Sequence, residues 1–92
     1  MQLRVLDLNR NHIRSEGASA LGLALQRSDS MEAVHAQNNG IQEKGALALA
    51  VALKSSESML VVDLFGNSFP YVRLKIDAML QGCDRPVQLL YE

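Results

Sequence analysis

The feature that most constrains this chain is that it repeats itself every 28 residues. When the 92-residue sequence is shifted by 28 positions, ten residues of its first segment meet an identical residue. The identical pairs are Asn11 and Asn39, Ile13 and Ile41, Gly17 and Gly45, Ala18 and Ala46, Ala20 and Ala48, Leu21 and Leu49, Ala24 and Ala52, Leu25 and Leu53, Ser28 and Ser56, and Ser30 and Ser58. Repeats of roughly 20–50 residues are typical of stacked architectures, in which each unit buries its apolar side against its neighbours. We therefore expect a single domain made of repeats 3–30, 31–58 and 59–86 and a terminal strand 87–92.

Each repeat predicts a strand followed by a helix. The triplet Val62-Asp63-Leu64 alternates apolar and polar residues, as a strand does. Ala46, Leu49 and Leu53 recur at the i, i+3, i+7 spacing of one helix face, and Ser15 and Glu43 are the expected helix starts. The Asn at the centre of each unit is expected to end the strand and to hydrogen-bond the backbone of neighbouring units, because its amide both donates and accepts. The predicted class is therefore α/β, with a parallel sheet and helices packed on one side of it.

These residues carry a recognisable pattern. Leu3-x-x-Leu6-x-Leu8-x-x-Asn11-x-Ile13, followed by Gly17-Ala18-x-Ala20-Leu21-x-x-Ala24-Leu25, resembles the leucine-rich repeat, and its length resembles the ribonuclease-inhibitor-like subclass of that family. The resemblance implies a short solenoid arc with the parallel sheet on the concave face and the helices on the convex face. It also implies protein binding, usually through the concave face. The third unit departs from the pattern, since Val72 and Arg73 replace the Gly-Ala pair that begins each earlier helix.

The 28-residue period predicts which residues are neighbours on the concave face, because adjacent strands of a parallel sheet lie about 4.8 Å apart. The expected solvent-facing rows are Arg4–Glu32–Leu60–Gln88, Val5–Ala33–Val61–Leu89, Asp7–His35–Asp63–Tyr91 and Asn9–Gln37–Phe65. The row of Leu6, Val34, Val62 and Leu90 is expected to face the core. Apolar side chains gather towards the C-terminal side of these rows, and an apolar patch rimmed by polar groups is typical of a binding surface. The predicted partner-binding residues are Val5, Asp7, Asn9, Ala33, His35, Gln37, Leu60, Val61, Asp63, Phe65, Leu89 and Tyr91. The alternative is ordinary sheet packing, since branched residues suit a pleated surface.

His35 between Asp7 and Asp63 is the most chemically distinctive feature of the sequence. A histidine flanked by two carboxylates is compatible with a general base or with part of a metal site. Metal sites need further ligands, however, and no nucleophile motif or phosphate-binding loop accompanies the trio. We therefore favour a cross-strand charge ladder and expect no catalytic residue, no cofactor and no metal.

Composition narrows the classes of partner. The formal net charge is −1, so bulk charge does not favour nucleic-acid binding. Cys83 is the single cysteine, which excludes an internal disulfide and fits a reducing compartment. No apolar run reaches the roughly 18 residues that span a membrane, and the first residues do not resemble a signal peptide. We expect an intracellular, cytoplasmic protein that can associate with the cytoskeleton.

The sequence thus predicts a non-catalytic protein-interaction module, a small scaffold subunit within a larger intracellular assembly such as a cytoskeletal or ciliary one. Protein partners are expected on the concave face and at the strands that begin and end the stack, where unpaired edges can associate. Nucleic acid, membrane and small-molecule substrates are not expected. The alternative function is a regulatory fragment that activates or inhibits a partner enzyme such as a GTPase.

Overall fold

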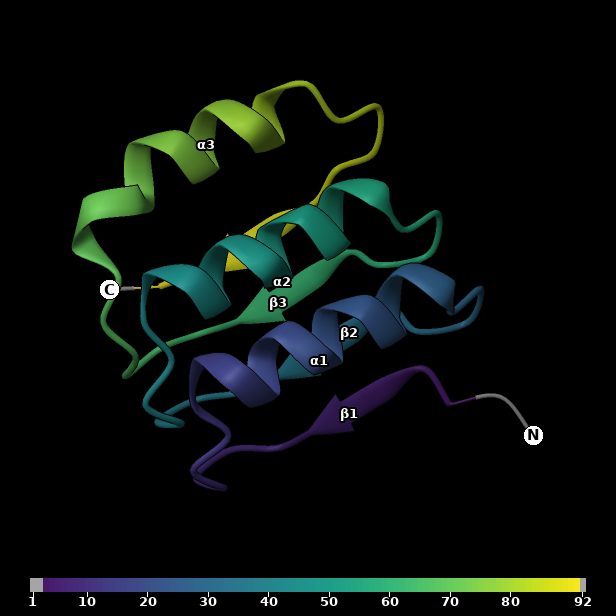
Figure 1. Cartoon of the computed structure of the whole chain (residues 1–92). Helices are drawn as coiled ribbons and strands as arrows, with labels where there is room; N and C mark the ends of the chain where they lie inside the picture. Colours follow the sequence, from purple (N-terminus) through teal and green to yellow (C-terminus); the bar gives the residue numbers. More distant parts are fainter. Residues whose placement is uncertain (1–2, 92) are drawn as a thin grey trace.

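The structure, a computed structural model, describes residues 3–91 and alternates short strands with helices along the chain (Figure 1). Its elements are β1 (Val5–Asp7), α1 (Arg14–Arg27), β2 (Ala33–His35), α2 (Glu43–Ser55), β3 (Val61–Asp63), the 3-10 turn η1 (Pro70–Val72), α3 (Arg73–Gln81) and β4 (Gln88–Leu90). The predicted α/β class and the strand-then-helix order of each unit are confirmed.

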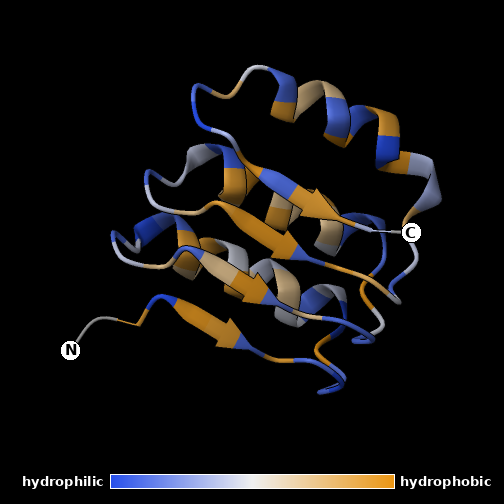
Figure 2. Cartoon of the chain, turned by 180° about the vertical axis from the view of Figure 1, so that it is seen from behind, coloured by the Kyte–Doolittle hydropathy of each residue, from blue (hydrophilic) through white to orange (hydrophobic). Residues whose placement is uncertain are grey.

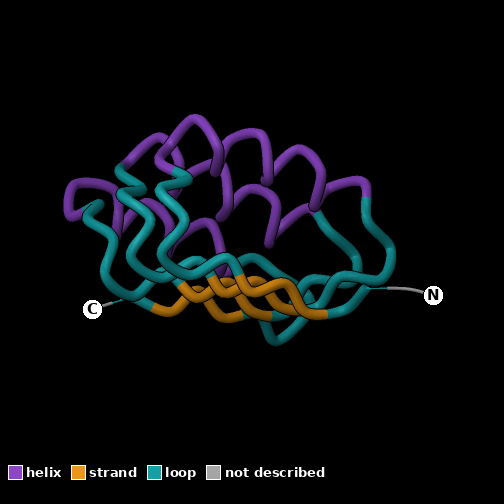
Figure 3. The backbone as a smooth tube through the Cα atoms, turned by 90° about the horizontal axis from the view of Figure 1, so that it is seen from below, coloured by secondary structure: helices purple, strands orange, loops and turns teal. Residues whose placement is uncertain are grey.

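The four strands form one parallel sheet in the order β1-β2-β3-β4, so each strand pairs with the next one along the chain. The helices all lie on the same side of this sheet, and the other side is free of helices (Figure 3). We call this helix-free side of the sheet the open face. A parallel pair needs a crossover connection, and here each connection is a helix, which leaves one side of the sheet uncovered.

The core fills the space between the sheet and the helices. Val34 and Val62 point into it from the strands, and Leu49 and Leu53 meet them from α2, all fully buried. Phe69, in the loop before η1, is the largest fully buried side chain. Seen from the open face, the strands are mostly hydrophobic and the loops that join them to the helices mostly hydrophilic (Figure 2). The central unit is the best buried because it has a neighbour on each side.

Asparagine amides connect the loops that follow the strands, as the sequence predicts. Asn39 Oδ1 accepts the backbone N–H groups of Asn11 (2.7 Å) and Ile13 (3.3 Å), while its Nδ2 donates to the carbonyl of Leu8 (2.8 Å). Asn67 repeats this arrangement one unit later, on the backbone of Asn39 and Ile41 and the carbonyl of Ala36. Each amide therefore satisfies backbone groups that burial would otherwise leave unpaired.

The helix beginnings agree with the sequence to within one residue. α2 begins at Glu43 as expected, whereas α1 begins at Arg14, one residue before the expected Ser15. The Ser15 hydroxyl does not cap its own helix. It accepts the backbone N–H groups of Gln42 (3.0 Å) and Gly45 (3.2 Å), at the start of α2. Ser15 lies in the first turn of α1 and therefore links the beginnings of the two helices.

The pairing of β4 differs from the expected 28-residue offset. The first three strands keep it, with Val5 opposite Ala33 and Ala33 opposite Val61, but Val61 lies opposite Gln88, an offset of 27. The apolar residues that begin a strand explain the difference. Met59 stands three residues before the core-facing Val62, whereas Val87 stands only two residues before Leu89. Strict alternation then directs Val87, Leu89 and Tyr91 towards the helices, where they pack against the core.

No helix within residues 3–91 is both long enough and apolar enough to cross a membrane.

Candidate functional site

The open face presents three rows of side chains that run across the strands. Two follow from the strand pairing, namely Val5–Ala33–Val61–Gln88 and Asp7–His35–Asp63–Leu90. The third lies where the strands end and contains Asn9, Gln37 and Phe65, linked because Asn9 Oδ1 accepts the backbone N–H of Gln37 (2.6 Å). Ten of the twelve predicted binding residues are thereby brought together, counting Leu60 directly before β3.

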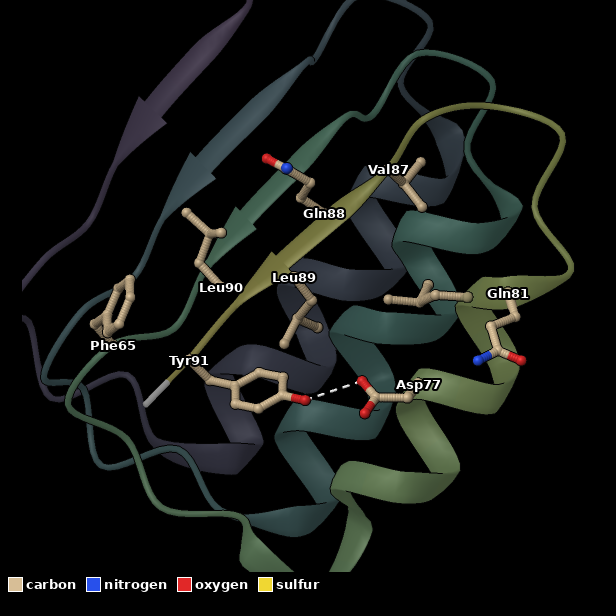
Figure 4. A pocket seen from close by; sticks show the side chains of 9 residues that line it. Phe65, Asp77, Gln81, Val87, Gln88, Leu89, Leu90 and Tyr91 are labelled. Atoms are coloured by element: carbon tan, nitrogen blue, oxygen red, sulfur yellow. Dashed lines mark hydrogen bonds between the residues drawn. The ribbon is translucent and has the colours of Figure 1, made fainter.

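Leu89 and Tyr91, the two other predicted binding residues, do not lie on this face. The alternation of β4 turns both side chains towards the helices, and Leu90 takes the place on the open face that Tyr91 was expected to hold (Figure 4). Tyr91 packs edge-on against Phe69, with ring centroids 5.4 Å apart, and its hydroxyl donates to Asp77 Oδ1 at 2.9 Å. The predicted row placement of these two residues is therefore wrong, because it assumed an unchanged offset.

The centre of the open face is a polar cluster built on Asp63. This carboxylate is only 5% exposed and accepts three hydrogen bonds. His35 Nδ1 lies 3.2 Å from Oδ2, Gln37 Nε2 donates to the same oxygen at 2.6 Å, and the backbone N–H of Phe65 donates to Oδ1 at 3.2 Å. Because the carboxylate is an acceptor, the proton between His35 and Asp63 belongs on Nδ1, which fixes the ring orientation and the tautomer.

The pKa of the Asp63 carboxyl reflects this cluster. Burial acts to raise the pKa, but the hydrogen bonds from His35, Gln37 and the Phe65 backbone, together with the charge of His35, outweigh it and lower the pKa below its ordinary value. Asp63 is therefore an ionised, fully hydrogen-bonded group that holds two neighbouring side chains in place.

The predicted charge ladder Asp7–His35–Asp63 forms on one side only. His35 pairs with Asp63, while Asp7 stands opposite His35 in the sheet and uses Oδ1 to accept the backbone N–H of Asn9 (3.1 Å). Asp63 lies in the buried interior of the sheet and Asp7 on its exposed first strand, so the stronger attraction is on the Asp63 side.

An apolar patch adjoins the polar cluster towards β4. Leu60 and Phe65 are each 38% exposed, large fractions for side chains of this kind. Val61 lies between them on β3, and Leu90 of β4 points to the same side as Phe65 (Figure 4). We call Leu60, Val61, Phe65 and Leu90 the apolar patch. The open face thus carries the polar cluster of His35, Gln37 and Asp63 at its centre, with the apolar patch beside it on β3 and β4.

A solvent-accessible pocket extends along β4, lined by α3 residues on the helix side and by Phe65, Gln88 and Leu90 of the open face (Figure 4). It is lined by Leu80, Leu89 and Tyr91 among others, with Asp77 at its polar side. The Tyr91–Asp77 hydrogen bond occupies both polar groups and raises the pKa of Tyr91, with burial adding to the effect. The pocket therefore presents an apolar wall without a pair of free acid and base groups.

Within residues 3–91 no group of three or more His, Cys, Asp or Glu side chains is arranged to hold a metal ion. His35 has one carboxylate partner at hydrogen-bond distance and no further ligating side chain with it.

One residue of the open face, Leu90, and one contact of Gln37 were missed by the sequence reasoning. Leu90 was expected in the core, and the two-residue spacing of Val87 and Leu89 is the signal that would have placed it correctly. Gln37 was expected on the face, but its hydrogen bond to Asp63 was not. The side-chain rotamer decides whether Gln37 reaches the neighbouring strand, and the 28-residue period does not specify rotamers.

The comparisons with known proteins bear on the repeat itself. A family model described as Leucine Rich repeat matches residues 2–22, which comprise β1 and the first part of α1. No curated protein matches the chain. The family match supports a leucine-rich repeat protein, and domains of this kind generally mediate protein–protein interaction.

Proposed function

We propose that this chain is a non-catalytic protein-interaction module that binds its partner through the open face of the sheet. The observation that carries the proposal is the apolar patch beside the polar cluster. Leu60 and Phe65 remain partly exposed although the core a few ångströms away has buried residues of the same type. Apolar side chains next to oriented polar groups are the usual composition of a protein interface.

The finer expectations are also part of this proposal. The strand-and-helix units would form a short solenoid arc of the ribonuclease-inhibitor-like subclass, with the open face as its concave side. The module would act as a small scaffold subunit in an intracellular assembly, for example a cytoskeletal or ciliary one. The 28-residue period and the match to one repeat support the family, and the helix-free sheet supports the face.

The test is affinity capture with a matched pair of variants. The first variant carries Val61→Lys and Phe65→Lys, which place two charges in the apolar patch. The control carries Leu23→Lys and Leu74→Lys, two exposed apolar positions on α1 and α3. Both variants gain the same charge, and circular dichroism melting checks that both are folded.

We expect proteins captured by the wild-type chain to be retained by the control and lost, by about tenfold or more, with the open-face variant, because a buried charge disrupts a central apolar contact. Capture that survives in the open-face variant and disappears in the control would contradict the proposal and assign binding to the helix side. The alternative function, regulation of a partner enzyme such as a GTPase, adds one measurement, the rate of that enzyme with and without the chain.

A further inference from the structure

We infer that the partner of the open face presents a cationic side chain, a lysine or arginine, to Asp7 and His35, next to an apolar side chain seated on the apolar patch. This inference rests on the proposed function and adds the chemistry of the partner. It follows from which hydrogen-bonding groups the open face leaves without a protein partner.

The first step concerns His35. Its Nδ1 is engaged by the buried Asp63 carboxylate, and its side chain is 37% exposed. With the proton on Nδ1, the Nε2 atom of the neutral ring is a hydrogen-bond acceptor, and it makes no hydrogen bond within residues 3–91. Gln37 donates to the same Asp63 oxygen and so holds the carboxylate in the position that orients the His35 ring.

The second step concerns Asp7. It stands directly opposite His35 on the neighbouring strand, and neighbouring strands lie about 4.8 Å apart. Its Oδ1 accepts the Asn9 backbone N–H, and its Oδ2 makes no recorded hydrogen bond to the described part of the chain. Two acceptors, one of them charged, therefore stand side by side on the exposed half of the row. A group with several N–H donors and a positive charge complements both at once.

The third step is the charge of the whole face. Asp7, Asp63 and Glu32 contribute three carboxylates, whereas Arg4 contributes one guanidinium, which lies 4.0 Å from Glu32. A cation is therefore attracted to the middle row. Arg10, in the loop after β1, and Arg14, the first residue of α1, repel a cation from that side and favour its placement at Asp7 and His35.

The fourth step is the neighbouring apolar patch, which lies one to two strands further along the sheet. A fully hydrated lysine or arginine binds a carboxylate only weakly. The ion pair therefore becomes stronger where neighbouring apolar groups exclude water. The partner segment that fits this face carries a basic residue and an apolar or aromatic residue about two strand spacings, or ~10 Å, apart.

The experiment uses a random 12-residue peptide library displayed on phage, selected against the immobilised full chain at about pH 8. We expect lysine and arginine to be enriched about two- to fivefold over the starting library, together with an apolar residue. The fluorescein-labelled best peptide is then titrated with the wild-type chain, with Asp7→Asn and with Asp29→Asn. Asp7→Asn keeps a side-chain oxygen for Asn9, and Asp29 is an exposed carboxylate in the α1–β2 loop.

We expect Asp7→Asn to weaken the peptide by about two- to fivefold, which is the usual size of one partly exposed ion pair, and Asp29→Asn to leave it unchanged. Enriched peptides that are acidic or uncharged, or equal affinities for the two variants, would overturn the inference and leave the proposed function intact. Peptides that still bind the Val61→Lys, Phe65→Lys chain at wild-type strength would instead contradict the proposed function.

Discussion

The two helix–helix interfaces of this molecule are built by different means. α1 and α2 approach closely through small residues. A Cβ atom on Gly45 would lie 2.8 Å from the Ser15 Cα and 3.0 Å from the Ala18 Cβ, and one on Gly22 would lie 2.9 Å from the Ala48 carbonyl oxygen. α3 packs less extensively against α2, and it has only nine residues, of which Ile76 alone is buried. The first interface is backbone against backbone, and the second is not.

Long side chains replace close packing in the C-terminal unit. The Arg73 guanidinium lies 4.9 Å from the centre of the Tyr91 ring and 5.9 Å from that of Phe69. Arg85 donates to the carbonyl of Leu53 (2.8 Å) at the end of α2 and to that of Met59. The difference teaches that a repeat can lose its small-residue pattern and keep its place in the stack, provided that aromatic and guanidinium groups bridge the gap.

The largest effect is expected where the C-terminal unit depends on a single aromatic side chain. Phe69→Ala should lower the free energy of unfolding by about 3–5 kcal/mol, because it empties a fully buried site. Phe65→Ala is the control, since it removes the same side chain from a site that is 38% exposed, and should cost less than about 1 kcal/mol. Urea unfolding measures both. Equal losses would show that Phe69 does not support the C-terminal unit.

The next effect tests the close approach of α1 and α2. Gly45→Ala should destabilise the fold by about 1–3 kcal/mol, because the new methyl group meets the backbone at Ser15. Gly82→Ala, at the end of α3, adds the same methyl group where the nearest atom, the Met79 carbonyl oxygen, is 3.9 Å away. The control should be neutral in the same urea titration. A tolerated Gly45→Ala would mean that the two interfaces do not differ as described.

Acid should lower the stability of the fold through Asp63 of β3, which lies between the closely packed N-terminal units and the C-terminal unit. Since the pKa of Asp63 is lowered in the folded state, its ionised form stabilises the fold above the ordinary aspartate pKa of about 4, and this contribution is lost as the pH falls through the folded-state value. Thermal melts between about pH 7 and pH 2 should therefore decline less steeply for Asp63→Asn than for the wild type. At neutral pH the variant should lose about 1–2 kcal/mol. Identical acid profiles for the wild type and Asp63→Asn would show that Asp63 is not the source of the acid sensitivity.

The smallest effect concerns the hydroxyl that joins β4 to α3. Tyr91→Phe keeps the ring beside Arg73 and Phe69 and removes only the hydrogen bond to Asp77, so we expect a loss of about 0.5–1 kcal/mol. Tyr71→Phe, at a side chain that is 91% exposed, is the matched control and should change nothing measurable. A larger loss at Tyr71 than at Tyr91 would contradict the role of the Tyr91 hydroxyl.

The regular units were predictable because each residue in them repeats a neighbour's environment. Asn39 and Asn67 could be assigned to backbone hydrogen bonds, and Asp7, His35 and Asp63 to one row, from the period alone. The errors fall where the period changes. Leu89, Leu90 and Tyr91 were placed on the wrong sides because one residue fewer precedes β4, and a shift of one residue reverses every side chain of a strand. The unequal pairing of His35 with its two carboxylates depends on burial, which the period does not describe.

The asparagine amides impose a direction on how the molecule can assemble. The loop after β1 is completed by Asn39 and the loop after β2 by Asn67, so each turn of chain receives its last hydrogen bonds from residues synthesised about 28 positions later. Because the ribosome synthesises the chain from its N-terminus, an early unit would lack these hydrogen bonds until the next unit has emerged. The folding of each unit is then expected to be completed only after the following repeat has been synthesised.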